Sequence, residues 1–166
     1  MIKNIVLISS VAVLVISAAI WISWPAPGKE ERTNTAAVIN TALLSGESSF
    51  DFGTISMAAG KVSHEFKIRN SSSAPVKITN LSTSCMCTEA SLITSAGRKG
   101  PFGMPGHGFF NPKIGEIINP GEEGTVEVVF DPAAHGPAGV GAIQRAVYIE
   151  TAGGGKEIEI KAIVTP

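Results

Sequence analysis

KVSHEFKIRN, residues Lys61 to Asn70, is the stretch of sequence that indicates the fold. Every second residue from Val62 to Ile68 is apolar or a histidine, whereas the residues between them are polar or charged. Successive side chains of a β-strand point to opposite faces, so this alternation predicts a half-buried antiparallel strand. The residues expected to face a core are Val62, His64, Phe66 and Ile68. We interpret His64 as a histidine packed in the core or at a strand edge.

Segments with the same period recur along the chain after Phe50. The predicted strands are Phe50 to Ile55, Val76 to Ser84, Lys113 to Ile118, Thr125 to Phe130, Ile143 to Thr151 and Ile158 to Val164. Clusters of Asn, Pro, Gly and Ser separate them, as turns between strands require. About seven short strands, with no helical period after Phe50, predict an all-β fold, an immunoglobulin-like antiparallel β-sandwich.

The composition excludes two classes of partner. Charged residues make up 16% of the chain and the formal net charge is −1, so no basic surface for nucleic acid is expected. The chain has 18 glycines, but no glycine run follows a strand and opens a helix, and the P-loop lysine pattern is absent. We therefore expect neither a nucleic acid nor a nucleotide to bind.

An uncharged segment near the N-terminus, Ile5 to Trp24, predicts a membrane helix. Its length matches the roughly 20 apolar residues that cross a bilayer. Lys3 precedes it, whereas the charges of residues 29–32 cancel, so the positive-inside rule places the N-terminus in the cytoplasm and the rest of the chain outside. We thus expect a single-pass protein of the cell membrane with residues 1–24 as its anchor. A signal peptide cleaved after Ser17-Ala18-Ala19 is the alternative.

The rest of the chain divides into a linker, residues 25–49, and the sandwich domain, residues 50–166. Residues 97–112 read GRKGPFGMPGHGFFNP and are expected to form an inserted loop, which at this length is usually functional or disordered. If each strand reverses the direction of the last one, the connections 85–112 and 131–142 emerge at the same end of the sandwich. This would bring their reactive side chains together.

The two cysteines of the chain, Cys85 and Cys87, are the strongest candidates for chemistry. In extended backbone, residues i and i+2 point the same way, so the two thiols would face one point with their Cα atoms about 6.5 Å apart. Such a pair could hold a soft metal ion. The alternatives are two buried, inert cysteines or a disulfide, although a bridge across one residue departs from preferred disulfide geometry.

Three further residues of the two connections extend this candidate site. Met104 and His107 lie in the Gly-rich loop, and His135 lies in the segment DPAAHG of the second connection. Two thiolates and two imidazoles suit zinc, whereas thiolate with the Met104 thioether favours Cu(I). The predicted metal ligands are Cys85, Cys87, His107, His135 and, for copper, Met104. Each histidine taken alone can equally be a loop residue that is hydrogen-bonded to backbone.

Several short motifs, in this order, resemble one bacterial family. They are Phe50 to Ile55, Phe66 to Asn70, Ala74 to Ile78, Ser84 to Thr88 and Asn119 to Glu122. Together they resemble the domain of unknown function 1573, which implies an immunoglobulin-like domain of the ASPM, SPD-2, Hydin type, usually exported or membrane-anchored, without an established activity. The chain also resembles a subset of that family with Cys-Met-Cys-Thr, Met-Pro-Gly-His and Asp-Pro-x-x-His-Gly motifs. That subset implies one shared site, while the ligand roles are our inference from the residues.

These observations support three hypotheses. The first is a membrane-anchored extracytoplasmic sandwich that holds copper, or alternatively zinc, for metal binding or for delivery to a partner protein rather than for catalysis. The second is a thiol redox protein in which Cys85 and Cys87 cycle between dithiol and disulfide, with His107 or His135 supplying the nearby positive charge. The third is a structural or adhesion module with inert cysteines.

Overall fold

The computed structural model of the chain describes residues 43–107 and 112–166. The predicted membrane anchor, and residues 25–42 of the predicted linker, lie outside the described residues. Within the described stretches, no helix has both the length and the apolar character that a membrane span requires. The membrane anchor therefore stays a prediction.

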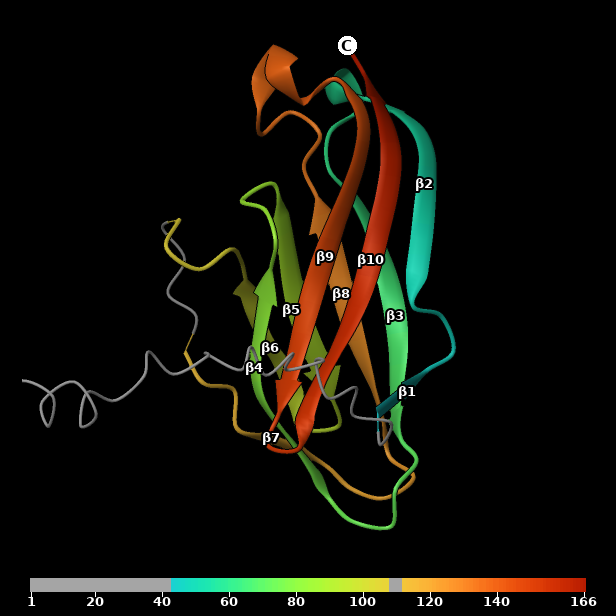
Figure 1. Cartoon of the computed structure of the whole chain (residues 1–166), viewed down its shortest axis with the longest axis vertical. Coiled ribbons are helices and arrows are strands. Elements are labelled where there is room, and N and C mark those ends of the chain that lie inside the picture. The colour runs from blue at the N-terminus through green and yellow to red at the C-terminus, as the bar shows by residue number, and fades with distance from the viewer. Residues whose placement is uncertain (1–42, 108–111) are drawn as a thin grey trace, which may run out of the picture. The chain divides into compact units, whose positions relative to one another are not determined.

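Ten β-strands make up the described part of the domain, in two sheets of five (Figure 1). Their bounds are β1 Leu43–Ser45, β2 Ser49–Ser56, β3 Val62–Asn70, β4 Val76–Thr83, β5 Thr88–Thr94, β6 Gly97–Phe102, β7 Glu116–Ile118, β8 Glu123–Phe130, β9 Gly141–Thr151 and β10 Gly154–Thr165, with short 3₁₀ turns η1 Met57–Ala59 and η2 Gly136–Gly139. One sheet has the order β1-β3-β8-β5-β6 and the other β2-β10-β9-β4-β7. Neighbouring strands are antiparallel, except that β2 and β10 are parallel. The predicted all-β, two-sheet class is confirmed.

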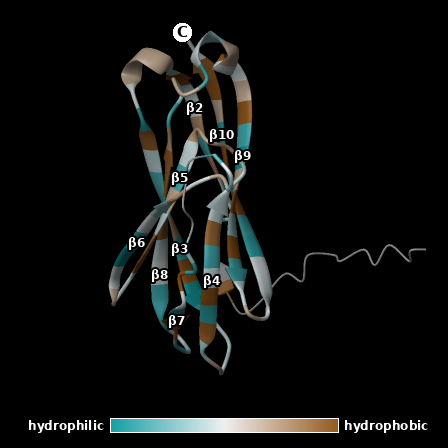
Figure 2. Ribbon diagram, turned by 90° about the vertical axis from the view of Figure 1, so that its left-hand side faces the viewer, coloured by the Kyte–Doolittle hydropathy of each residue, from teal (hydrophilic) through white to brown (hydrophobic). Residues whose placement is uncertain are grey.

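The core lies between the two sheets and follows the alternation in the sequence. Apolar residues recur along the strands of both sheets (Figure 2). In β3, Phe66 and Ile68 are buried whereas Glu65 and Lys67 are exposed, as the pattern of this stretch predicts. Phe66 lies opposite Val126 of β8 in the register of the two strands. Fully burying a side chain of this kind contributes about 1.5–3 kcal/mol, so such pairs stabilise the sandwich.

His64 occupies the position on the core face of β3 that its strand pattern predicts. Its ring stacks on the ring of Phe50, with the centroids 3.5 Å apart, and meets the ring of Phe66 edge-on. Its Nε2 atom lies 3.0 Å from Oε2 of Glu47. The interpretation of His64 as a packed histidine is therefore confirmed.

The connection 85–112 contains a hairpin that the sequence analysis did not predict. Strand β5 begins directly after Cys87, and Gly97–Phe102 forms β6, so the first part of the predicted loop 97–112 is a strand. Phe102, at the end of β6, is buried in the core. The prediction was wrong here because GRKGPF contains two glycines and a proline, which are depleted in strand interiors.

The two connections that carry the candidate residues nevertheless emerge at the same end of the sandwich, as predicted. Strands β4 and β7 are antiparallel, and the β5–β6 hairpin reverses the chain twice, which leaves the predicted directions unchanged. Strand β8 ends opposite the beginning of β5, where Phe130 pairs with Thr88. The N–H of Asp131 donates a hydrogen bond of 2.9 Å to the carbonyl of Cys87, which joins the two connections directly.

Candidate functional site

Cys85 and Cys87 lie in a tight turn that links β4 to β5. The N–H of Thr88 donates to the carbonyl of Cys85 over 3.1 Å, which closes the turn. The Cα atoms of the two cysteines are 5.3 Å apart, and the two residues are joined in a disulfide. The predicted extended arrangement with two free thiols is therefore not the one observed. A disulfide needs a Cα separation of about 4.4–6.8 Å, and the turn supplies it.

Hydroxyl side chains on either side of the turn fix it against both sheets. The N–H of Ser84 donates to the carbonyl of Ala146 in β9, and the N–H of Ala146 donates to Oγ of Ser84, each over 2.9 Å. The hydroxyl of Thr83 lies 3.0 Å from the carbonyl oxygen of Cys85 and 2.9 Å from that of Thr88. Because Thr83 and Thr88 are buried, the turn is packed on the sandwich.

His135 reaches the disulfide from the connection between β8 and β9. The side chain of Asp131 accepts a hydrogen bond of 2.9 Å from the N–H of Ala133, which turns the chain directly after β8. The imidazole of His135 is exposed, and its Nε2 lies 3.1 Å from Sγ of Cys85. Gly139 of η2 lies close to the base of this side chain, since a Cβ on Gly139 would come within 3.2 Å of the His135 Cβ. The predicted meeting of the two connections at this point is confirmed.

Arg145 of β9 contacts the disulfide, which the sequence analysis missed. Its Nε donates a hydrogen bond of 3.3 Å to Sγ of Cys87, and its Nη1 donates to the carbonyl of Gln144. From the sequence, only His107 and His135 are expected to supply a positive charge near the cysteines. A signal was present, because Arg145 is two residues from Val147 and therefore on the same, buried face of β9. An arginine on such a face needs a polar or anionic partner.

The two sulfurs have different surroundings. Cys87 is 2% exposed, whereas Cys85 is partly buried. Besides contacting His135, Sγ of Cys85 accepts a hydrogen bond of 3.3 Å from the N–H of Cys87. Sγ of Cys87 lies 3.7 Å from Oγ1 of Thr88 and accepts the hydrogen bond from Arg145. As a residue, Cys85 is therefore less buried than Cys87, while the sulfur of Cys87 has the permanently charged donor.

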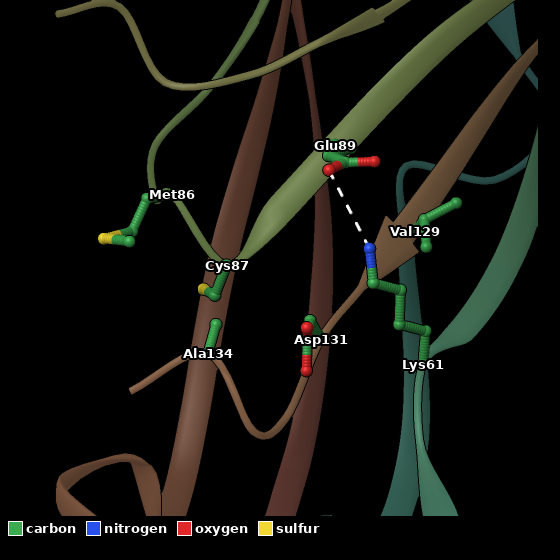
Figure 3. Close-up of a pocket in the computed structure, with 7 residues that line it drawn as sticks. All are labelled: Lys61, Met86, Cys87, Glu89, Val129, Asp131 and Ala134. Atoms are coloured by element: carbon green, nitrogen blue, oxygen red, sulfur yellow. Dashed lines mark ion pairs between the residues drawn. The ribbon is translucent and has the colours of Figure 1, made fainter. Parts of the chain in front are cut away.

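A small pocket opens beside Cys87 (Figure 3). Its volume is about 50 Å³, and its lining residues are Lys61, Met86, Cys87, Glu89, Val129, Asp131 and Ala134. Lys61 and Glu89 form an ion pair of 3.9 Å on the side opposite Met86 and Cys87 (Figure 3). Each water molecule needs about 10–15 Å³, so the pocket has room for a few waters and not for a segment of another protein.

Three of the five predicted metal ligands lie together. The ligand atoms of Cys85, Cys87 and His135 are all within 4.8 Å of one another. His107 is not in this group: its side chain is exposed, and its N–H donates to the carbonyl of the half-buried Met104 over 3.4 Å. The loop continues into residues 108–111, which lie outside the described part of the chain. The roles of His107 and Met104 as ligands stay predictions.

The fold and the site define a class of protein: a two-sheet β-sandwich with a Cys-x-Cys disulfide in the turn after β4. Residues 43–103 match the model of the family described as protein of unknown function (DUF1573). The matched residues include the cysteine turn, whereas His107 and His135 lie beyond them. No curated protein sequence matches the chain.

Solved structures with a similar fold come from several organisms. A protein of unknown function from Porphyromonas gingivalis W83 is 16% identical with a TM-score of 0.52, over 74% of this chain and 46% of that one. The VesB protease of Vibrio cholerae is 17% identical with a TM-score of 0.44, over 76% of this chain and 32% of that one. The ASH/PapD-like domain 7 of human CEP192 is 13% identical with a TM-score of 0.42, over 75% of this chain and 86% of that one. This chain thus spans less than half the length of the two bacterial proteins. At these identities the similarity concerns the fold alone.

Proposed function

We propose that the domain is a thiol–disulfide exchange module, in which Cys85 and Cys87 cycle between disulfide and dithiol with a partner protein. The observation that carries this proposal is the set of groups around the bond. An imidazole nitrogen lies 3.1 Å from one sulfur, and a guanidinium nitrogen lies 3.3 Å from the other. A cationic neighbour stabilises the thiolate, which is both the nucleophile and the leaving group in exchange.

The position of the bond in the chain also favours exchange over a purely structural role. Met86 is the only residue between the two cysteines, so the bond closes a very short loop. The loss of chain entropy that a disulfide imposes on the unfolded state grows with the length of the closed loop, so this bond stabilises the domain less than a bond between distant strands would. Cys85 is partly exposed at an end of the sandwich, where a partner thiol can reach it.

The proposal places the domain outside the cytoplasm. Disulfides persist in oxidising compartments and are rare in the cytosol, where thiols are kept reduced. This fits the predicted anchor at Ile5 to Trp24, which would hold the domain at the outer side of the cell membrane, next to membrane-bound or secreted redox partners.

Counting reactive thiols in the full-length chain tests the exchange. We expect alkylation of both cysteines after treatment with dithiothreitol and of neither after later exposure to glutathione disulfide, with the circular dichroism spectrum unchanged throughout. The double variant with Cys85→Ser and Cys87→Ser is the control and should show no reactive thiol. If the bond resists dithiothreitol until denaturant unfolds the domain, the disulfide is structural and the adhesion-module hypothesis replaces ours.

The reduced form of the same site supports a second function, the binding of a soft metal ion. The observation that favours it is the grouping of the ligand atoms of Cys85, Cys87 and His135 within 4.8 Å. A thiol reductant would release two thiolates, which together with the imidazole suit Cu(I) or, less well, Zn(II). Arg145 opposes this function, because its charge lies against Sγ of Cys87 and repels a cation there. We therefore place exchange first.

Metal binding is tested on the reduced full-length chain without oxygen, with Cu(I) supplied from a bicinchoninate complex. We expect Cys85→Ser and Cys87→Ser each to abolish tight binding, because a hydroxyl does not replace a thiolate toward Cu(I), and His135→Ala to weaken it. His107→Ala and Met104→Leu show whether the Gly-rich loop contributes; a loss at Met104 with copper but not with zinc identifies a thioether ligand. Unchanged binding in both Cys→Ser variants would exclude a metal site at this turn.

A further inference from the structure

We infer that the two cysteines have different roles in the exchange: Cys85 forms the mixed disulfide with the partner, and Cys87 leaves as a thiolate held by Arg145. This inference rests on the proposed exchange function and adds to it the direction of the reaction. It gives a role to Arg145, which lies outside the residues matched by the family model.

The two cysteines differ in the burial of the whole residue, and we take this difference to select the sulfur that is attacked. Cys87 is 2% exposed, and the pocket beside it, of about 50 Å³, has no room for a protein segment that carries a thiol. Cys85 is partly buried, and its sulfur lies next to the exposed imidazole of His135. A partner that approaches from solvent therefore meets Cys85 first.

Charge selects the sulfur that leaves. The donors at Sγ of Cys85 are a backbone N–H and an imidazole, whereas Sγ of Cys87 accepts from a guanidinium, which stays protonated in proteins. The carboxylate of Asp131, which also lines the pocket beside Cys87, accepts a hydrogen bond from the N–H of Ala133. A better-stabilised thiolate leaves faster, so cleavage that puts the electron pair on Cys87 is favoured.

Arg145 is held in place for this task by its strand. It lies in β9, between β10 and β4, and its Nη1 donates a hydrogen bond of 2.9 Å to the carbonyl of Gln144. The N–H of the next residue, Ala146, donates to Oγ of Ser84, which directly precedes the cysteine turn. The guanidinium and the disulfide are therefore fixed to the same pair of strands, and the contact does not depend on a mobile surface side chain.

The reaction balances with a dithiol protein as the only co-reactant. A thiolate of the partner attacks Sγ of Cys85, a new S–S bond forms there, and the electron pair of the broken bond goes to Sγ of Cys87. The second thiol of the partner then attacks the partner's own sulfur in the mixed disulfide, and its proton passes to the released Cys85. The domain ends as a dithiol with Cys87 as thiolate, and the partner is oxidised to a disulfide. The reverse sequence oxidises the domain at the expense of a partner disulfide.

Single-cysteine variants of the full-length chain test which sulfur reacts with the partner. The probe is glutathione disulfide, and the product is the mixed disulfide, detected by intact-protein mass. Cys85 in the Cys87→Ser variant should react at least about tenfold faster than Cys87 in the Cys85→Ser variant, because access controls the rate of exchange. Equal rates, or a faster reaction of Cys87, would overturn the assignment.

Substitutions of Arg145 test the role of its charge. Arg145→Gln should slow the reduction of the disulfide by dithiothreitol about tenfold, and Arg145→Lys should restore most of the rate because the positive charge is kept. Arg69→Gln is the matched control. Arg69 is exposed on β3 at the end of the strand that lies away from the cysteine turn, and its loss should leave the reduction rate unchanged. A rate in Arg145→Gln equal to that of the unmodified chain, or a loss that Arg145→Lys does not restore, would overturn this role.

The two proposals fail in different ways. If the disulfide of the folded, unmodified chain is not reduced at all, the exchange function itself is wrong. If the bond is reduced and reformed but Arg145→Gln has no effect, exchange stands and the role of Arg145 is wrong. The comparison of the two single-cysteine variants involves no change at Arg145, so it decides the roles of the sulfurs even if Arg145→Gln does not fold.

Discussion

The core between the sheets and the cysteine end, formed by Cys85, Cys87, His135 and Arg145, are built in different ways. In the core, buried apolar side chains of paired strands meet in register, as Phe66 and Val126 do. At the cysteine end, the contacts are polar and converge on one disulfide: His135 contacts Sγ of Cys85, and Arg145 donates a hydrogen bond to Sγ of Cys87. The core therefore determines whether the domain folds, and the cysteine end determines how it reacts. Substitutions in one region should leave the other property unchanged.

The largest effect on stability is expected for Phe66→Ala in the core. Truncating a fully buried phenylalanine costs about 3–5 kcal/mol, because it removes apolar contacts and leaves a cavity. Urea denaturation followed by circular dichroism measures this loss. Glu65→Ala, on the exposed face of the same strand, is the control and should change stability by less than about 0.5 kcal/mol. Equal effects at the two positions would contradict the register of β3.

Val128→Ala should destabilise the domain by about 2 kcal/mol, less than Phe66→Ala because fewer buried atoms are removed. Under native conditions, its rate of disulfide reduction by dithiothreitol should equal that of the unmodified chain. Together, the two measurements test whether the stability of the core and the reactivity of the cysteine end are independent. A large change in the reduction rate, without global unfolding, would show that the core and the cysteine end are coupled.

Reduction of the disulfide should lower the free energy of unfolding by only about 1–2 kcal/mol, because the closed loop is so short. Parallel urea titrations of the oxidised and reduced full-length chain give the difference. A loss above about 4 kcal/mol, the size expected of a long-loop staple, would mean that the bond is a structural element of the fold.

A smaller, pH-dependent effect is expected at Glu116, away from the cysteines. The hydroxyl of Thr94, which donates to its carboxylate over 2.7 Å, and the ammonium of Lys99, at 2.9 Å, hold the pKa of Glu116 below its ordinary value. The stability that this provides is complete above the ordinary glutamate value of about 4.3 and is lost as the pH falls through the lowered value. Glu116→Gln should remove this part of the acid sensitivity, measured as unfolding free energy against pH. Glu150→Gln, the exposed control, should leave the acid sensitivity of the unfolding free energy unchanged.

His135→Ala should have the smallest effect on stability, within about 0.5 kcal/mol, because the imidazole is exposed. Thermal unfolding of the two oxidised proteins makes the comparison. A destabilisation comparable to that of Val128→Ala would show that His135 is a structural residue, and the separation between the two regions would then fail at this position.

The core and part of the cysteine end could be predicted from the sequence. The alternation in β3 is visible because apolar and polar residues repeat every two positions, and the meeting of the two connections follows from counting strand directions. Strand β5 was missed because its buried positions include polar residues, among them Thr88 and Ser91. The cysteine turn was missed because hydrogen bonds from the N–H of Thr88 and the hydroxyl of Thr83 hold it, and the short Cys-Met-Cys sequence carries no turn residue such as Gly or Pro.

The redox midpoint of the Cys85–Cys87 pair tests the central claim most directly. The full-length chain is equilibrated with glutathione buffers of graded potential, and the fraction of dithiol is read by alkylation and mass. Our account predicts one reversible two-electron transition in the folded protein with a midpoint above about −300 mV, where exchangeable disulfides lie. A midpoint below about −300 mV, or reduction that occurs only together with unfolding, would contradict it.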